Sequence, residues 1–180
     1  MTILIRRIVL LLLLFGLARA AGSAETRDPY QYFFNPLTGD LKAELNDARA
    51  AGKKAVFLVF EQEGCPGCLH MKNHVLNRPD VQKFYREHFL NFTIDIFSSV
   101  PVVDFAGRAY TEKTYALTLK VKGTPTLLFF DSDGKEVVRI LGTVREADEF
   151  LTLGEFVTSG AYKTRKFAEY KQDPQRKKGS

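Results

Sequence analysis

The stretch VFLVFEQEGCPGCLHMK, residues 56–72, decides the fold, because it joins a long apolar run to the two cysteines of the chain. Residues 56–60 are apolar and β-prone throughout, which is typical of a central strand covered on both faces. From Cys65 to about Leu76 the pattern is helical, and Pro66 suits a first helical turn, where its missing N–H needs no partner. Cys65 is therefore predicted to lie where a buried strand has ended and a helix begins.

The segments on either side extend this pattern into an alternation of helices and strands. Before the stretch, Leu41, Leu45 and Ala48 share one helical face, and Gly52 follows as a helix end would require. After it, the sequence predicts a helix at 79–89, a strand at 90–97, a loop at 98–110, a helix at 111–121, two strands around a turn within 125–142, and a helix at 145–160. This order predicts an α/β fold with a central mixed sheet and helices on both faces.

The amino-terminal residues resemble a secretory signal. Arg6 and Arg7 precede an apolar run at 8–17, and small residues follow, so we expect a signal peptide at 1–20, cleaved after Ala20 or alternatively after Ala24. The run is shorter than the ~20 apolar residues that a spanning helix needs. A periplasmic location is therefore expected, with one domain at 25–162.

The carboxyl-terminal segment 163–180 is rich in lysine and arginine and contributes to the net charge of +5. Its composition predicts a solvated, flexible tail. In the body of the chain no basic stripe alternates with aromatic residues, so nucleic-acid binding is not expected.

The two cysteines allow three interpretations. As a structural staple, so short a loop would contribute about 2 kcal/mol, which a domain of this size does not need. As a metal site, the pair lacks ligands, because His70 and His74 fall on the opposite side of a helix that begins at Cys65. Copper(I) held by the two thiolates alone remains an alternative.

A redox pair accounts for more of the surroundings. The sulfur of Cys65 would face unpaired N–H groups and the positive end of the helix dipole, both of which favour a thiolate. Cys68 lies one turn further along, within reach of the first sulfur and expected to be more buried. We therefore expect Cys65 to attack and Cys68 to resolve.

The segments VFLVFEQEGCPGC and VKGTPTLLFFDSDGKEVVRILG together resemble the thioredoxin family over residues 41–156. The resemblance implies a thioredoxin-like fold without a cofactor. It also implies that Pro125 is a cis-proline facing the disulfide. The backbone of Thr124 would then pair with an extended substrate segment, beside Pro66 and Gly67.

The sequence also departs from ordinary thioredoxins. The motif is CPGC rather than CGPC, Gly64 replaces the usual tryptophan, and Val59 stands where the family has a buried aspartate. Glu61 is a candidate for the missing proton carrier if the strand stays regular, and otherwise a surface charge at the strand end.

Within the family, EQEGCPGC, NRPDVQKFYREHF and the loop after TIDIF resemble exported SoxW-type thioredoxins of sulfur-oxidising systems. Because no cation or histidine lies between the cysteines, we expect a reductant of protein disulfides. The resemblance implies electron supply from a membrane thiol reductant of the DsbD or CcdA kind. A thiol oxidase or disulfide isomerase, and a copper(I)-binding chaperone, are the alternatives.

Overall fold

The structure is a computed structural model that describes residues 26–173. The predicted signal peptide and its cleavage sites lie outside the described residues. No helix within 26–173 has the length and apolar character needed to cross a membrane. Along the chain the elements are α2 (Pro29–Tyr32), α3 (Leu41–Ala50), β1 (Ala55–Glu61), α4 (Pro66–His74), α5 (Pro79–His88), β2 (Phe89–Asp95), β3 (Pro101–Val103), β4 (Ala109–Thr111), α6 (Glu112–Thr118), β5 (Thr126–Phe130), β6 (Glu136–Leu141), α7 (Ala147–Thr158), the 3-10 turn η2 (Ala161–Lys163) and α8 (Phe167–Gln172).

Four strands form the central sheet in the order β2-β1-β5-β6. β1 pairs in parallel with β2 and antiparallel with β5, and β5 pairs antiparallel with β6. Every residue of β1 is buried, as the continuous apolar run predicted. The mixed sheet flanked by helices confirms the predicted fold class.

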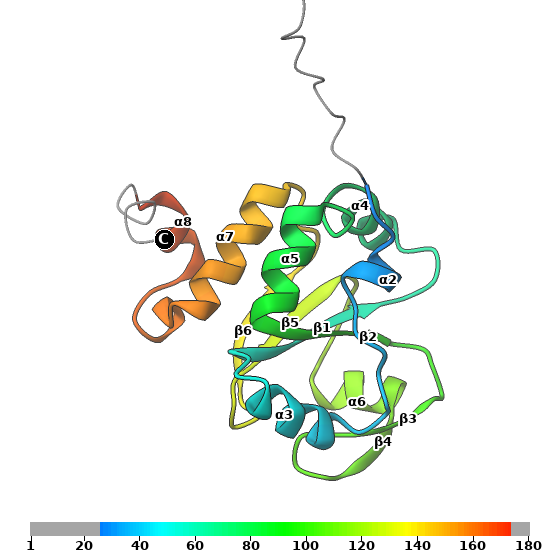
Figure 1. The fold of residues 1–180 in the computed structure, drawn as a ribbon. Coiled ribbons are helices and arrows are strands. Elements are labelled where there is room, and N and C mark those ends of the chain that lie inside the picture. Colours follow the sequence, from blue (N-terminus) through cyan, green and yellow to red (C-terminus); the bar gives the residue numbers. More distant parts are fainter. Residues whose placement is uncertain (1–25, 174–180) are drawn as a thin grey trace, which may run out of the picture.

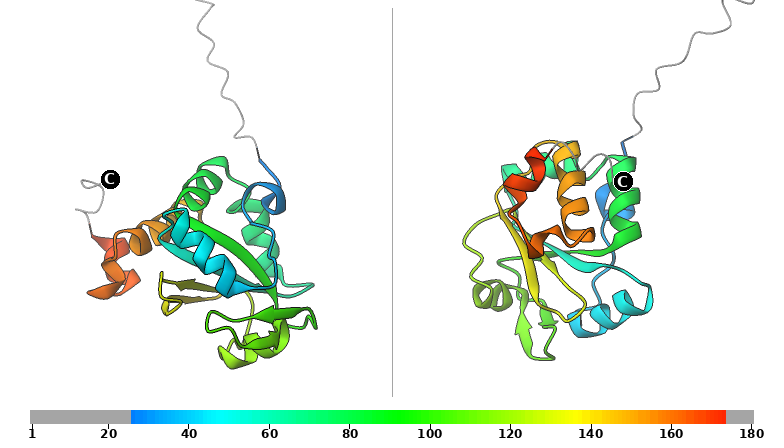
Figure 2. Two further views of the ribbon diagram at one scale, coloured as in Figure 1. Left: turned by 60° about the horizontal axis from the view of Figure 1, so that its bottom comes forward. Right: turned by 90° about the vertical axis from the view of Figure 1, so that its left-hand side faces the viewer.

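Two hydrophobic clusters cover the two faces of the sheet, because successive side chains of a strand point to opposite sides. Phe57 and Val59 of β1 belong to the cluster that includes residues of α4, α5 and α7. Val56, Leu58 and Phe60 belong to the cluster that includes residues of α3 and α6. Figures 1 and 2 show these two groups of helices on opposite sides of the strands.

The short helix α2 is anchored in the first cluster by the two phenylalanines that follow it. Phe33 and Phe34 are 0% and 3% exposed, and the Phe33 ring lies 5.4 Å from that of Tyr85. This anchor fixes α2 beside the carboxyl end of β1 (Figure 1). Tyr30 is thereby carried toward the cysteine motif.

Two sequence predictions are wrong. Residues 98–110 are not a structureless loop, because β3 and β4 form an antiparallel hairpin whose Val102 is 1% exposed. Its turn is built by Asp104, which accepts hydrogen bonds from the backbone N–H groups of Ala106 and Arg108. Strands of three residues are too short to show the alternation that identifies longer ones.

The predicted flexible tail is also wrong for its first part. Helix α8 packs on α7 through Tyr170, which is 7% exposed and lies 5.2 Å, ring to ring, from Phe156. Lys171 and Glu149 join the two helices by an ion pair of 2.7 Å. The packed structure therefore extends beyond residue 162, and residues 174–180 lie outside the described residues.

Candidate active site

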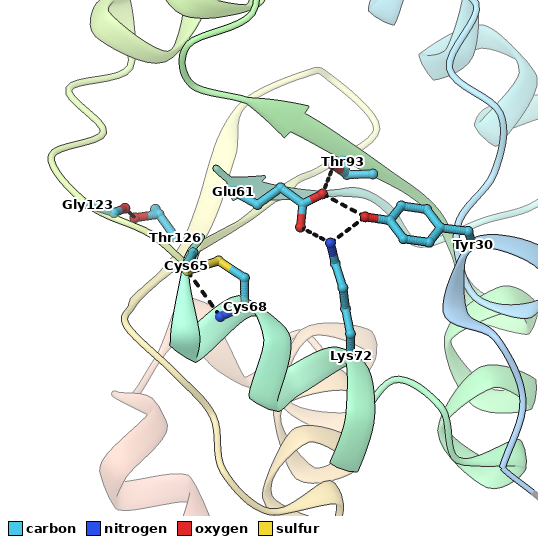
Figure 3. Close-up of a disulfide and its surroundings, with 8 residues drawn as sticks. All are labelled: Tyr30, Glu61, Cys65, Cys68, Lys72, Thr93, Gly123 and Thr126. Carbon is cyan, nitrogen blue, oxygen red and sulfur yellow. Dashed lines mark hydrogen bonds and ion pairs between the residues drawn. A yellow bond between two sulfur atoms is a disulfide. The ribbon is translucent and has the colours of Figure 1, made fainter. Parts of the chain in front are cut away.

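Cys65 and Cys68 are joined in a disulfide where β1 gives way to α4 (Figure 3). Their Cα atoms are 5.3 Å apart, within the range of about 4.4–6.8 Å that a disulfide requires. Cys65 is the N-cap of α4 and Pro66 is its first residue, as the sequence predicted. The motif thus places both sulfurs at the positive end of a helix.

The backbone N–H of Cys68 points at the sulfur of Cys65 at 3.1 Å. The two residues differ little in exposure, 7% for Cys65 and 5% for Cys68. Cys68 is therefore only slightly more buried than Cys65, and burial does not separate the two sulfurs. What distinguishes the two sulfurs is this N–H contact, because a donor aimed at sulfur stabilises a thiolate.

Pro125 lies against the motif, and the Thr124–Pro125 peptide bond is cis, as the family resemblance implied. A Cβ atom on Gly67 would stand 3.0 Å from Pro125 Cδ and 2.2 Å from Thr143 Oγ1. Glycine at 67 therefore lets the motif and two loops approach closely. Thr143 was missed from the sequence, and its only signal is its place directly after the turn at Gly142.

The backbone of Thr124 is available to a partner. Within residues 26–173, no hydrogen bond uses its N–H or its C=O, whereas the next carbonyl, that of Pro125, accepts from Gly142 N–H at 2.9 Å. Thr124 itself is partly exposed. An extended segment passing the motif can pair with these free groups.

Glu61 is buried, not a surface charge, so that alternative is wrong. It is 9% exposed and pairs with Asp95 in a ladder that stays regular to the end of β1. Its Oε1 accepts hydrogen bonds from Thr93 Oγ1 at 2.9 Å and from Tyr30 Oη at 3.2 Å. Figure 3 shows these side chains meeting beside the disulfide.

Lys72 of α4 completes this network. Its Nζ lies 2.7 Å from Glu61 Oε2 and also donates to the Tyr30 hydroxyl. Burial lowers the pKa of Lys72, but the hydrogen bonds to Glu61 and Tyr30 raise it more, so the net pKa lies above its usual 10.5. The ammonium is held charged and holds the carboxylate in place.

Sequence reasoning missed Lys72, Tyr30 and Thr93. Lys72 could have been found, because it follows Cys68 by four residues and so shares its helical face. Thr93 and Tyr30 had no local signal, since each comes from a different segment that meets Glu61 only in the folded chain.

Comparison with known proteins agrees with this geometry. The family model described as "Thioredoxin-like domain" matches residues 41–158. The chain belongs to the thioredoxin-like family. A search of curated proteins found no match.

Solved structures with the same fold include three bacterial examples. A thioredoxin from Thermus thermophilus is 26% identical, with a TM-score of 0.51, covering 74% of this chain and 87% of that one. A thioredoxin-fold protein from Helicobacter pylori is 23% identical, with a TM-score of 0.58, covering 72% and 88%. A putative disulphide-isomerase from Bacteroides thetaiotaomicron is 23% identical, with a TM-score of 0.53, covering 69% and 90%.

The two histidines of α4 lie next to each other on the helix that begins after Cys65. The rings of His70 and His74 are 4.8 Å apart, and His70 Nε2 lies 3.1 Å from the carbonyl oxygen of Arg145. In the part of the chain that the structure describes, no three His, Cys, Asp or Glu side chains are grouped to hold a metal ion.

One groove contains the cysteines of the CPGC motif, residues 65–68, and a second begins at Pro125, which lies against Gly67. The acidic groove, of about 540 Å³, contains both cysteines and is lined by Tyr30, Glu61, Gln62, Glu63, Gly64, Cys65, Pro66, Cys68, Leu69, Lys72 and Asp95. The basic groove, of about 680 Å³, begins at Pro125 and is lined by Leu119, Lys120, Lys122, Gly123, Thr124, Pro125, Thr126, Arg139, Leu141 and Gly142.

Proposed function

We propose that this member of the thioredoxin-like family is an exported thiol–disulfide oxidoreductase that reduces disulfides in other proteins. The observation that carries the proposal is the sulfur of Cys65 at the start of α4, 3.1 Å from the Cys68 N–H, in a motif whose Gly67 lies closely against cis-Pro125. A sulfur so placed can act as a thiolate at the point where a substrate segment docks.

In the first step, the thiolate of Cys65 attacks one sulfur of the substrate disulfide. A Cys65–substrate disulfide forms, the substrate S–S bond breaks, and the second substrate sulfur leaves as a thiolate that takes a proton. The N–H and C=O of Thr124 hold the substrate backbone extended beside Cys65.

In the second step, Cys68 loses its proton and attacks the sulfur of Cys65. The Cys65–Cys68 bond forms as the Cys65–substrate bond breaks, and the released substrate sulfur takes up a proton from solvent. The substrate leaves as a dithiol, and the protein keeps the disulfide seen in the structure, so two electrons pass to the substrate. Glu61 is the proton acceptor in this proposal, since it is buried in the same groove as Cys68, directly or through one water.

Whether the protein reduces or oxidises its substrates depends on how strongly its reduced form is stabilised. Pro66 and Gly67 bring no charge between the cysteines, so the helix start is the main support of the thiolate. Less stabilisation of the reduced form means a lower reduction potential, which we place below about −180 mV.

Export and partners complete the proposal. The signal-like residues 1–20 support a periplasmic location. A periplasmic reductant needs electrons from across the membrane, and we propose a membrane thiol reductant of the DsbD or CcdA kind. The resemblance to SoxW-type thioredoxins supports a role in sulfur oxidation.

The test combines trapping with a redox titration of the mature protein. Cys68→Ser should accumulate mixed disulfides with substrates, whereas Cys65→Ser should accumulate none. Free thiols counted in dithiothreitol or glutathione buffers give the potential. A value near −120 mV would indicate an oxidase instead. Tight stoichiometric copper(I) binding without disulfide reduction would indicate a copper chaperone.

A further inference from the structure

The basic groove lies between the end of β6 and the segment that connects α6 to β5. β6 is an edge strand. Helix α3 reaches the β5–β6 turn, where Arg49 donates to the carbonyl of Ser132. Helix α6 packs on β2. At the opposite end of β6, Leu141 and Gly142 line the groove together with the connection between α6 and β5.

The charge of this groove is one-sided. Its ionisable lining residues are Lys120, Lys122 and Arg139, with no carboxylate among them. Arg139 is already paired with Glu136 at 2.6 Å. In residues 26–173, neither Lys120 nor Lys122 makes a hydrogen bond or ion pair through its side chain, and both are exposed. Two positive charges are left for a ligand.

The position of Lys120 is unusual for a lysine. Its φ of 56° is left-handed, and it is the one non-glycine residue with positive φ in the described part of the chain. It follows the C-cap of α6, where glycine is the favoured residue because it has no Cβ. A cation thus occupies a place that local folding would assign to glycine.

The remaining walls suit an extended polypeptide. Leu141 is 73% exposed and gives an apolar side wall. Thr124 lines the groove beside Pro125, and its backbone N–H and C=O make no hydrogen bond within residues 26–173. A strand-like segment paired there can direct alternate side chains into the groove.

We propose that the basic groove selects substrates in which acidic side chains lie next to the reactive cysteine in an extended segment. Lys120 and Lys122 receive the carboxylates, and Leu141 receives an apolar neighbour. This inference rests on the proposed function, and it names the substrate class for the same site.

The test measures how fast Cys65 forms a mixed disulfide, using the Cys68→Ser variant. The probes are two peptides with the same activated cysteine disulfide, one flanked by aspartates and the other by lysines, plus a small uncharged disulfide. We expect the acidic peptide to react about tenfold faster than the basic one at low salt, with the ratio falling toward one as salt screens the charges.

Lys120→Glu with Lys122→Glu should invert that preference, with each peptide rate divided by the rate of the same variant on the uncharged disulfide. The matched control is Lys54→Glu with Lys135→Glu, which makes the same charge change on exposed lysines at the other end of β1 and β6. The control should keep most of the preference.

The outcomes test the groove assignment and the proposed function separately. Equal rates for the two peptides, or equal loss of preference in the control, would overturn the groove assignment and leave the proposed function intact. Failure of Cys65 to react with all three probes would overturn the proposed function, and the groove assignment with it.

Discussion

The acidic groove contains both cysteines of the CPGC motif, and the basic groove begins at Pro125, which lies against Gly67 of the same motif, yet the two are built for different tasks. In the acidic groove, the buried Glu61 is held in place by Tyr30, Thr93 and Lys72. The basic groove has two exposed charges, Lys120 and Lys122, whose side chains have no partner among residues 26–173. Fixed, buried charges suit proton transfer, whereas free, exposed charges suit recognition of a partner.

The largest expected effect comes from the acidic groove. Glu61→Gln should slow the resolution of the Cys65–substrate disulfide by about 10²-fold, because the proton acceptor for Cys68 is lost. The first attack and the preference for acidic peptides should stay unchanged. Stopped-flow kinetics on pre-formed mixed disulfides measures the resolution step.

The control for this variant is Glu63→Gln, which removes an exposed carboxylate from the same groove. It should leave resolution within about twofold, since an exposed charge is screened by solvent. If Glu63→Gln slows resolution as much as Glu61→Gln, the effect belongs to the general charge of the groove and not to the buried carboxylate.

The close approach of Gly67 to Pro125 and Thr143 should make the fold sensitive to a single added methyl group. In Gly67→Ala the new Cβ would stand 2.2 Å from Thr143 Oγ1 and 3.0 Å from Pro125 Cδ. We expect a loss of about 1–3 kcal/mol in the free energy of unfolding, measured by urea denaturation of the oxidised protein.

Two variants sharpen this expectation. Gly123→Ala, in the basic groove, should change stability by no more than about 0.5 kcal/mol, because nothing lies within 4 Å of its Cβ. Adding Thr143→Ala to Gly67→Ala should restore part of the loss, since one of the two close contacts disappears. Full additivity of these two changes would show that residues 67 and 143 do not interact.

In the basic groove, a single substitution should raise the stability of the fold and lower its selectivity for acidic peptides. Lys120→Gly should raise the free energy of unfolding by about 0.5–1 kcal/mol, because glycine adopts a left-handed φ without a Cβ clash. The preference for acidic peptides should fall about threefold. Urea denaturation and mixed-disulfide kinetics measure the two effects.

Lys122→Gly is the matched comparison, because Lys122 does not have a positive φ. It should lower selectivity to a similar extent without raising stability. A loss of selectivity confined to Lys120→Gly would place recognition on one lysine only.

Features that lie within one continuous stretch of sequence were predictable, whereas features assembled from distant segments were not. Cys65, Cys68 and β1 were predictable, since a continuous apolar run followed by Cys-Pro-Gly-Cys is a local pattern. The cis peptide before Pro125 was predicted only through the family resemblance, because spacing alone favours trans.

Other features depend on contacts between distant segments. Tyr30 reaches Glu61 because Phe33 anchors α2 in the core, and no pattern near Tyr30 indicates that contact. Helix α8 lies in the charged segment 163–180, whose composition predicts a solvated tail and gives no sign that one aromatic, Tyr170, is buried. The basic groove has no local pattern in the sequence either, because its lysines and Leu141 come from separate parts of the chain.

The smallest expected effect concerns the pH dependence of the locked network. The pKa of Lys72 is raised above 10.5, since hydrogen bonds to Glu61 and Tyr30 outweigh the effect of burial. A group with a raised pKa in the folded state contributes its stability fully below the unfolded pKa, and loses it as pH rises through the folded pKa. The difference in unfolding free energy between the native protein and Lys72→Met should therefore be constant from about pH 7 to 9.5. Above about pH 10.5 it should shrink by about 0.5 kcal/mol.

In a Tyr30→Phe background the same pair of curves should show a smaller change, since one of the two hydrogen bonds that raise the pKa of Lys72 is lost while Glu61 remains. Lys122→Met is the comparison from the basic groove. Its ammonium has no partner in the described residues, so its difference curve should stay flat across the same range. A flat curve for Lys72→Met as well would mean that the ammonium gains nothing from Glu61, and the contrast between a locked and a free set of charges would no longer hold.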